Sequence, residues 1–348
     1  MTGEDGGRSR LGGPADRVLE ASLAGGYSRI GYAVRSRLLP EFTGTGEPQL
    51  TGCTVLITGA TSGIGLAAAT RLASRGARVQ FLARNADRAE RTRRQIAAVA
   101  GRAGFDPGAT GYGLADLDDL DSIRAFAASF IGQHQRLDVL IHNAGAINPA
   151  FERSADGLER TIGAQVVAPF LLTWTLFGLL RGSAPARVIT VSSGGMYTRA
   201  LDVAGLKATA MARDYNGVAA YATAKRAQVA LSAEWARRAA GTGVAFHAMH
   251  PGWVRTPGIK ESLPAFSRLA GPVLRTPEQG ADTIVWLAGA EARRLGSGRF
   301  WHDRRPRPVN RVPGARPDPP GAASELWGWA AGKAGVDPDK LPAPEPGR

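Results

Sequence analysis

Short apolar segments alternate with helical segments through most of this 348-residue chain, and this alternation limits the folds open to it. Strands of three or four mostly uncharged residues are typical of a sheet that is buried on both faces. The pattern therefore predicts an α/β domain with a doubly wound parallel sheet of about seven strands and helices on both faces. The expected strands cover residues 54–57, 79–82, 139–141, 188–191, 244–247 and 299–301, with a weaker strand before Asp116.

The longest apolar stretch lies between Arg160 and Arg181, where 20 consecutive residues carry no formal charge. This length would span a bilayer. Gln165, Pro169 and the position between two expected strands favour a buried core helix instead. Two packings stay open for its apolar face, one against the chain's own sheet and one in a homodimer.

Two extensions flank the predicted domain of residues 51–301. Residues 1–50 are expected to be partly helical, because Tyr27, Ile30, Val34 and Leu38 recur near helical spacing. Arginines between them leave a peripheral membrane contact open, although packing on the outside of the domain is favoured. Residues 302–348 are rich in proline and glycine and are expected to form a largely irregular tail.

The formal net charge of +13 raises the question of nucleic-acid binding. The excess is scattered over residues 51–300, where 29 basic residues face 18 acidic ones, so no nucleic-acid partner is expected. The single cysteine, Cys53, excludes an intrachain disulfide and fits a cytoplasmic location. The five histidines show no metal-ligand spacing, so no metal is expected.

The first strand runs into the turn Thr58-Gly59-Ala60-Thr61-Ser62-Gly63-Ile64-Gly65, and a helix follows. Glycines at these spacings permit a tight turn and let backbone N–H groups approach a pyrophosphate at the helix N-terminus. The strand before the turn and the helix after it are the context that makes the pattern informative. The turn predicts a dinucleotide site that uses Gly59, Thr61, Ser62, Gly63, Ile64 and Gly65.

The end of the second strand bears on which dinucleotide binds. NAD-selective sites usually place an acidic residue about 20 residues after the glycines, to hold the ribose 2′-hydroxyl. Here Ala83 occupies that place and Arg84 follows it. A guanidinium can bind a 2′-phosphate through two hydrogen bonds. The sequence therefore favours NADP(H) over NAD(H).

Three further motifs follow in order: Asn143-Ala144-Gly145, Tyr221-x-x-x-Lys225 and Pro251-Gly252 with Thr256. Together with the glycine turn, the chain resembles the short-chain dehydrogenase/reductase family over roughly residues 51–301. The sequence around residues 191–196 and 250–253 looks closest to an orphan subgroup near the retinol-dehydrogenase-like reductases. His142 stands where another Asn is usual.

This resemblance implies a Rossmann-type fold and an NADP(H)-dependent oxidoreductase that interconverts a small-molecule carbonyl and an alcohol. Asp116 would contact the adenine, although a helix N-cap is an equally open reading of that residue. The further cofactor contacts implied are Leu117, Asn143, Ala144, Gly145, Tyr221, Lys225, Pro251, Gly252, Val254 and Thr256.

Tyr221 and Lys225 lie four residues apart, so they share one face of a helix. A free tyrosine has a pKa of about 10, and an adjacent ammonium is expected to lower that pKa and make Tyr221 a general acid/base. Lys225 would also hydrogen-bond the nicotinamide ribose, as it does in the family. The family pattern selects Ser193, rather than Ser192, to donate a hydrogen bond to the substrate oxygen.

The activity and the substrate stay open at this point. Gln165 stands where the family usually has an Asn that holds a water in a proton relay to the lysine. A catalytically weak or inactive NADP(H)-binding sensor or scaffold is therefore the alternative function. Residues 199–217 form an expected insertion, and residues 257–272 an expected lid. Trp253, Leu263 and Phe266 suggest an apolar substrate, although core packing explains them equally well.

Overall fold

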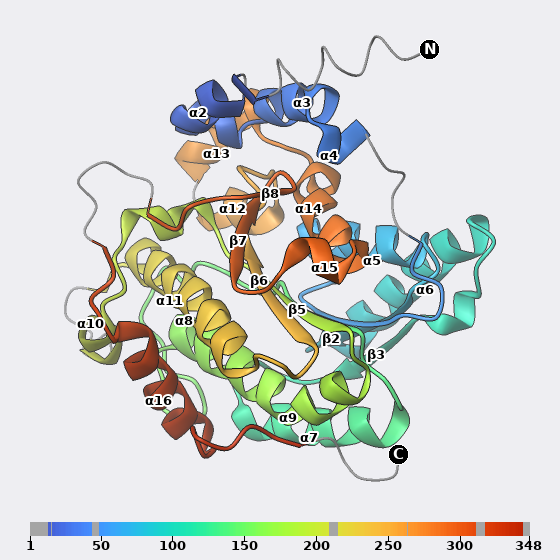
Figure 1. Ribbon diagram of the computed structural model, residues 1–348, viewed down its shortest axis with the longest axis vertical. Coiled ribbons are helices and arrows are strands. Elements are labelled where there is room, and N and C mark those ends of the chain that lie inside the picture. Colours follow the sequence, from blue (N-terminus) through green and yellow to red (C-terminus); the bar gives the residue numbers. More distant parts are fainter. Residues whose placement is uncertain are drawn as a thin grey trace.

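The computed structural model describes residues 13–14, 16–43, 49–208, 215–262, 264–310 and 317–343. Eight strands form one sheet in the order β3-β2-β1-β4-β5-β6-β7-β8 (Figure 1). Their bounds are β1 Thr54–Thr58, β2 Arg78–Ala83, β3 Gly111–Leu114, β4 Val139–His142, β5 Ala186–Val191, β6 Val244–Met249, β7 Arg299–His302 and β8 Arg305–Pro306. The first seven strands are parallel, as expected, and the short β8 adds an antiparallel edge.

Alternate residues of each strand enter two separate cores. Val55 and Ile57 of β1 face the core beneath α5 (Gly63–Ala73), α6 (Ala86–Arg102) and α14 (Pro277–Gly289). Leu56, between them, faces the core beneath α7 (Leu120–Gln133), α9 (Ala168–Gly182) and α11 (Gly217–Arg238). This period of two explains the uninterrupted apolar strands, since both faces of the sheet are covered.

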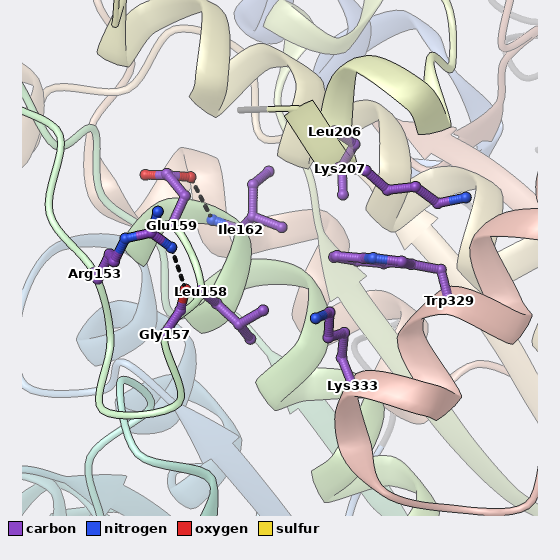
Figure 2. Close-up of a pocket in the computed structure, with 9 residues that line it drawn as sticks. All are labelled: Arg153, Gly157, Leu158, Glu159, Ile162, Leu206, Lys207, Trp329 and Lys333. Atoms are coloured by element: carbon purple, nitrogen blue, oxygen red, sulfur yellow. Dashed lines mark hydrogen bonds between the residues drawn. The ribbon is translucent and has the colours of Figure 1, made fainter. Parts of the chain in front are cut away.

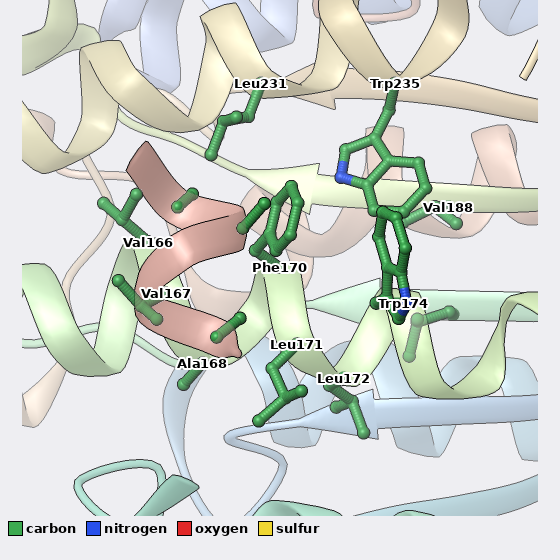
Figure 3. Close-up of a cluster of buried hydrophobic side chains, with 14 of the residues drawn as sticks. Val166, Val167, Ala168, Phe170, Leu171, Leu172, Trp174, Val188, Leu231 and Trp235 are labelled. Atoms are coloured by element: carbon green, nitrogen blue, oxygen red, sulfur yellow. The ribbon is translucent and has the colours of Figure 1, made fainter. Parts of the chain in front are cut away.

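The uncharged stretch forms α8 (Arg160–Ile162), a π-helical turn η2 (Gly163–Val167) and α9 without interruption. It is long and apolar enough to cross a membrane, but 72% of its most apolar window is buried inside this chain. Figure 3 shows Phe170 and Trp174 facing Trp235 of α11 and Val188 of β5. The prediction of a core helix is confirmed, and the chain's own fold accounts for the packing of α9.

The C-terminal tail differs from the expectation of a largely irregular segment. Residues 322–334 form α16 (Ala322–Ala334), which lies beside α11 (Figure 1). Trp327 is fully buried, with its ring centroid 4.7 Å from that of Trp235 and 4.9 Å from that of Phe170. The expectation was wrong for this helix because the flanking prolines and glycines outweighed a helical apolar stripe. That stripe contains Leu326, Trp327, Ala330, Ala331 and Ala334.

The N-terminal extension forms α2 (Leu23–Tyr27), α3 (Arg29–Leu38) and α4 (Pro40–Thr43) and packs on the domain near β8 (Figure 1). Its predicted apolar stripe is only partly buried, because Ile30 is 56% exposed. The most deeply buried long side chain of α3 is Arg35, at 1% exposure. Packing on the domain therefore depends on charge as well as on apolar contact.

We call the residues around this arginine the N-terminal clasp: Asp16, Glu20, Arg35, Arg275 and Asp303. Arg35 donates to Asp16 at 2.7 Å, to Glu20 at 2.7 Å and to Asp303 at 2.8 Å. Arg275 donates to both carboxylate oxygens of Asp303, at 2.6 and 2.8 Å. The clasp joins the N-terminal extension to the chain that follows β7.

The remaining helices are short and lie mainly around the carboxyl edge of the sheet and in its connections. They are η1 Pro107–Ala109, η3 Gly194–Thr198, α10 Val203–Ala208, α12 Pro257–Ser262, α13 Pro264–Ala270, η5 Gly271–Val273 and α15 Ala292–Leu295.

Candidate active site

The glycine turn lies between the carboxyl end of β1 and the start of α5, as predicted. Gly59 has φ +68°, and a side chain there would lie 2.8 Å from the Cα atom of Ala144. A Cβ atom on Gly65 would lie 2.2 Å from the carbonyl oxygen of Gly59. Ser62 precedes α5 without forming a side-chain cap, so N–H groups of the first turn remain for a ligand. The turn is a cradle that fits a pyrophosphate.

Asn143, at the end of β4, holds this turn in place. Its side-chain amide donates to the carbonyl oxygens of Thr58 and Gly59, both at 3.0 Å. The backbone N–H groups of Asn143 and Ala144 both donate to Thr58 Oγ1 at 3.1 Å. The Asn-Ala-Gly motif therefore supports the cradle, because the amide donors of Asn143 are already used within it.

The adjacent strands bring the other predicted cofactor residues to the same edge. Arg84, after β2, is 61% exposed, with its guanidinium 3.9 Å from Asp116 and 3.8 Å from Asp118. Leu117 lies next to Asp116 and is partly buried. Asp116 accepts from the backbone of Asp118, whereas Asp119 caps α7. The N-cap reading of Asp116 is thus wrong, and its 45%-exposed carboxylate faces the edge of the site.

The segment after β6 closes over the glycine turn. Val254 is buried, and the side chain of Thr256 lies 3.3 Å from the position of a Cβ atom on Gly63. Gly252 has φ +77°, and a side chain there would collide with Arg275, which also donates to the carbonyl oxygen of Pro251. These contacts place the predicted Pro251-Gly252 element beside the dinucleotide cradle.

Ser193, Tyr221 and Lys225 meet at the carboxyl ends of β5 and β6. Tyr221 forms a hydrogen bond with Ser193, and Lys225 Nζ lies 5.3 Å from the centroid of the Tyr221 ring. Ser192 points elsewhere, since its hydroxyl donates to the carbonyl oxygen of Lys225 at 2.9 Å. The structure therefore brings together the predicted serine, and not its neighbour, with the tyrosine.

The electrostatics of this group differ from the expectation. Burial raises the pKa of Tyr221, and the hydrogen bond with Ser193 opposes that rise. Burial also lowers the pKa of Lys225 to about 7. The predicted decrease in the tyrosine pKa is wrong for this environment, because burial penalises the charged phenolate. Tyr221 is accordingly protonated at neutral pH and is able to act as an acid.

Gln165 lies in the π-helical turn η2 and faces the lysine across Gly145. A Cβ atom on Gly145 would lie 2.9 Å from Gln165 Oε1 and 3.0 Å from Lys225 Nζ. The amide nitrogen of Gln165 donates to the carbonyl oxygen of Ala146 at 2.7 Å. Its oxygen is buried without a hydrogen-bond partner. The position expected from the family pattern is thus beside the lysine, with a glutamine in it.

The predicted lid region, residues 257–272, contains two helices, α12 and α13. The ring of Trp253 contacts Phe266 edge to face, at a centroid distance of 5.4 Å. The hydroxyl of Ser262 donates to the carbonyl oxygen of Ile147, which links the lid to the loop after β4. Leu263, the third predicted apolar residue, lies outside the described residues, as does part of the insertion at 199–217.

Sequence reasoning missed Tyr27, which reaches the site from the N-terminal extension. A Cβ atom on Gly194, the residue after Ser193, would lie 2.8 Å from its ring. Its carbonyl oxygen accepts from the backbone N–H of Trp253 at 2.9 Å and from Arg275 Nε at 3.1 Å. The position of Tyr27 in an apolar stripe was the one available signal, and that stripe does not reveal a partner.

A cavity of about 390 Å³ lies away from these residues (Figure 2). It is bounded by the loop before α8, by α10 and by α16. Arg153, Lys207, Lys333 and Trp329 line it. None of the predicted catalytic or cofactor residues does so, and the glycine cradle is therefore the site that the motifs build. Within the described part of the chain, no group of three or more His, Cys, Asp or Glu side chains is arranged to hold a metal ion.

Comparison with known proteins agrees with this geometry. A family model described as short chain dehydrogenase matches residues 53–265. Dehydrogenase/reductase SDR family member 12 of Bos taurus is 37% identical over 286 residues, which cover 82% of this chain and 86% of the relative. Retinol dehydrogenase 12 of Homo sapiens is 37% identical over 257 residues, or 73% of this chain and 79% of the relative. The predicted kinship with retinol-dehydrogenase-like reductases is confirmed.

A solved structure shares the fold as well. The Pseudomonas aeruginosa RhlG/NADP active-site complex is 26% identical, covers 72% of this chain and 94% of its own, and has a TM-score of 0.57. The fold match and the single parallel-dominated sheet confirm the single-domain α/β prediction.

Proposed function

The chain belongs to the short-chain dehydrogenase family, and on that premise we propose that it is an NADP(H)-dependent oxidoreductase that interconverts a carbonyl and an alcohol. The observation that carries this proposal is the convergence of Ser193, Tyr221 and Lys225 beside the glycine cradle. NADPH, when bound, supplies the hydride for the carbonyl carbon.

The chain's own residues would handle the proton. Ser193 donates a hydrogen bond to the carbonyl oxygen and orients it toward Tyr221. Tyr221, which is protonated at neutral pH, gives its proton to that oxygen as the alcohol forms. Lys225 stays buried next to the tyrosine and holds the cofactor ribose. A protonated tyrosine favours reduction as the working direction.

Substitution of the acid tests this mechanism. We expect Tyr221→Phe to lower kcat for NADPH-dependent carbonyl reduction by about 10²–10⁴-fold, because the proton donor is lost. NADPH binding, followed by cofactor fluorescence, should persist. Tyr112→Phe, on β3 and away from Ser193, is the matched control and should keep full activity. Equal turnover by wild type and Tyr221→Phe would refute the mechanism.

The preference for NADPH is proposed from Arg84 and from Ala83, which stands where NAD-selective sites usually have an acidic residue. We expect Arg84→Ala to raise the Kd for NADPH about tenfold or more and to leave NADH binding unchanged, because only NADPH carries the 2′-phosphate. Arg91→Ala, on the exposed face of α6, is the control. An equal loss for both cofactors would show that Arg84 does not recognise the phosphate.

An apolar substrate is proposed for the same site. The Trp253–Phe266 contact supports it, and so does the name of the relative that is a retinol dehydrogenase. A panel containing retinaldehyde, a long-chain aldehyde, an aromatic ketone and a polar sugar carbonyl tests this class. Higher kcat/KM for the polar compound would contradict it.

The alternative is an NADP(H)-binding sensor or scaffold without turnover. Gln165 in the family's Asn position favours it. Tight NADPH binding with no reduction of any carbonyl in the panel, by wild type as well as by Tyr221→Phe, would select this alternative.

A further inference from the structure

A second glutamine, Gln228, lies on α11 one helical turn beyond the active-site lysine and is buried. Lys225 Nζ donates to Gln228 Oε1 at 3.1 Å, and also to the carbonyl oxygen of Val191 at 3.0 Å. The amide nitrogen of Gln228 donates to the main-chain oxygen of Gln165 at 2.7 Å. One carboxamide thus bridges the lysine and the π-helical turn.

The main-chain neighbour of Gln228 fixes the orientation of this carboxamide. A carbonyl oxygen can only accept, so the nitrogen of Gln228 must face Gln165 and its oxygen faces Lys225. This arrangement removes the ambiguity that an amide side chain usually leaves.

The sequence that follows Gln165 removes one backbone donor to its carbonyl oxygen. In an α-helix it would accept from the residue four positions on, which is Pro169 and has no N–H. The π-helical turn at residues 163–167 accompanies this interruption. A buried carbonyl without a partner would cost free energy, and Gln228 satisfies it.

A small cavity of about 30 Å³ lies behind the bridge, large enough for about one water. Gln165 and Gln228 line it, together with His142, Thr173 and Ser232, whereas Lys225 does not. Three of the lining residues, Gln165, His142 and Ser232, carry a buried polar atom without a protein partner. The two glutamines therefore lie between the lysine and this small interior cavity.

We propose that the Gln228 carboxamide takes the place of the relay water that the family pattern implies next to Lys225. It positions the ammonium between two carbonyl-type oxygens, so Gln228 is a positioning residue. Water can accept and donate a proton at once, but a carboxamide nitrogen is not basic and does not pass a proton on. The proton that leaves the O–H bond of Tyr221 for the substrate oxygen is therefore replaced from solvent on the cleft side.

The bridge can be tested without turnover, because the chain has only five lysines and their ¹³Cε signals can be followed by NMR. Gln228→Ala removes an acceptor from the ammonium, so the pKa of Lys225 should fall. Gln228→Glu keeps the volume and places a carboxylate against the ammonium, so that pKa should rise by about 1–3 units. Ser232→Ala, one turn further along α11, is the buried control and should leave the Lys225 titration unchanged.

The kinetic part rests on the proposed function. For reduction, kcat should fall with rising pH as Lys225 loses its proton. The midpoint of that fall should move to lower pH in Gln228→Ala and to higher pH in Gln228→Glu. Single-turnover rates in mixtures of H₂O and D₂O should fall linearly for the wild type, since one proton moves. A curved dependence in the wild type would show a relay of several protons. It would overturn the proposal that Gln228 does not pass a proton on.

The outcomes of the two experiments are separable. Shifts of the Lys225 titration in the same direction for both variants, or no shift in either, would overturn the bridge whatever the activity. Opposite shifts without turnover by the wild type would keep the bridge and refute the proposed reduction. The Glu variant keeps the test decisive if Gln228→Ala does not fold, because its side chain fills the same space.

Discussion

The two extensions that flank the dehydrogenase domain are attached by opposite means. The N-terminal extension is held by the N-terminal clasp, in which Arg35 and Arg275 are each 1% exposed and share Asp303. The C-terminal helix α16 is held by aromatic packing, with Trp327 against Trp235 and other rings. Hydrogen-bonded charges require fixed geometry, whereas apolar contact tolerates change of shape. We therefore expect the clasp to hold the N-terminal extension in a fixed position, and α16 to contribute mainly to the stability of the fold.

The position of each extension relative to the site agrees with this division. The clasp fixes Tyr27, whose ring lies on Gly194 and whose carbonyl group accepts from the backbone of Trp253. Helix α16 contacts α9 and α11 on the face of the sheet that carries no glycine cradle. Alignment is thus used where Tyr27 and the lid residues meet, and apolar burial is used against the part of α11 that carries Trp235.

The largest effect should follow loss of the shared carboxylate. We expect Asp303→Asn to reduce the free energy of unfolding by about 3–5 kcal/mol, because buried Arg275 loses its carboxylate partner and Arg35 loses one of three. Asn is the suitable replacement, since Asp303 has φ +50° and Asn tolerates that conformation. Urea unfolding measures the loss. Glu325→Ala, in an exposed pair with Lys207, should cost no more than about 1 kcal/mol. Equal losses for the two variants would refute the role of burial.

The aromatic attachment should be weakened less by a conservative change. We expect Trp327→Leu to cost about 2–3 kcal/mol, because part of the apolar volume is retained. Trp329→Leu on the same helix is the control, since this ring is only half-buried and should contribute less. If Trp327→Leu also changed KM for the carbonyl substrate, α16 would have an aligning role, and the contrast between the extensions would fail.

Mild acid should weaken the N-terminal clasp but not the packing of α16, and this effect should be smaller than that of either substitution. Neighbouring arginines hold the pKa of Asp16 and of Asp303 below the usual range, against the effect of burial. Such groups contribute stability above the unfolded pKa of 3.8, and this contribution is lost as pH falls through and below that value. At pH 3.8 the loss is about 0.4 kcal/mol for Asp16. Hydrogen exchange should therefore increase in α3 before it does in α16, and the reverse order would contradict the comparison.

The parts of the molecule that follow from local pattern could be predicted from sequence. The glycine turn, the Tyr221–Lys225 spacing and the alternating strands each lie within a few residues of chain, so their geometry is set locally. The register of the sheet then brings Arg84 and Asp116 to the same edge as the turn. The family pattern selected Ser193, and the structure places its hydroxyl, rather than that of Ser192, beside Tyr221.

The parts that depend on distant partners could not be predicted. Arg35 was one of the arginines between the apolar residues of the predicted N-terminal helix. Arginine is rarely buried without a partner, and its partner Asp303 is 268 positions away. Gln228 gave no signal, because its role depends on the main-chain carbonyl of Gln165, which lies 63 positions away. Helix α16 was obscured by the prolines around it.

The span of the clasp has a consequence for how the chain is made. Arg35 leaves the ribosome long before Asp303, and synthesis of the intervening segment takes on the order of tens of seconds. During that interval α3 has neither Asp303 nor the edge of β8 to dock on. Such a long-range contact also slows folding. The wall that Tyr27 supplies can close only after the last strands have emerged, so a nascent chain that stops before β7 would carry every catalytic side chain and still have an unfinished pocket.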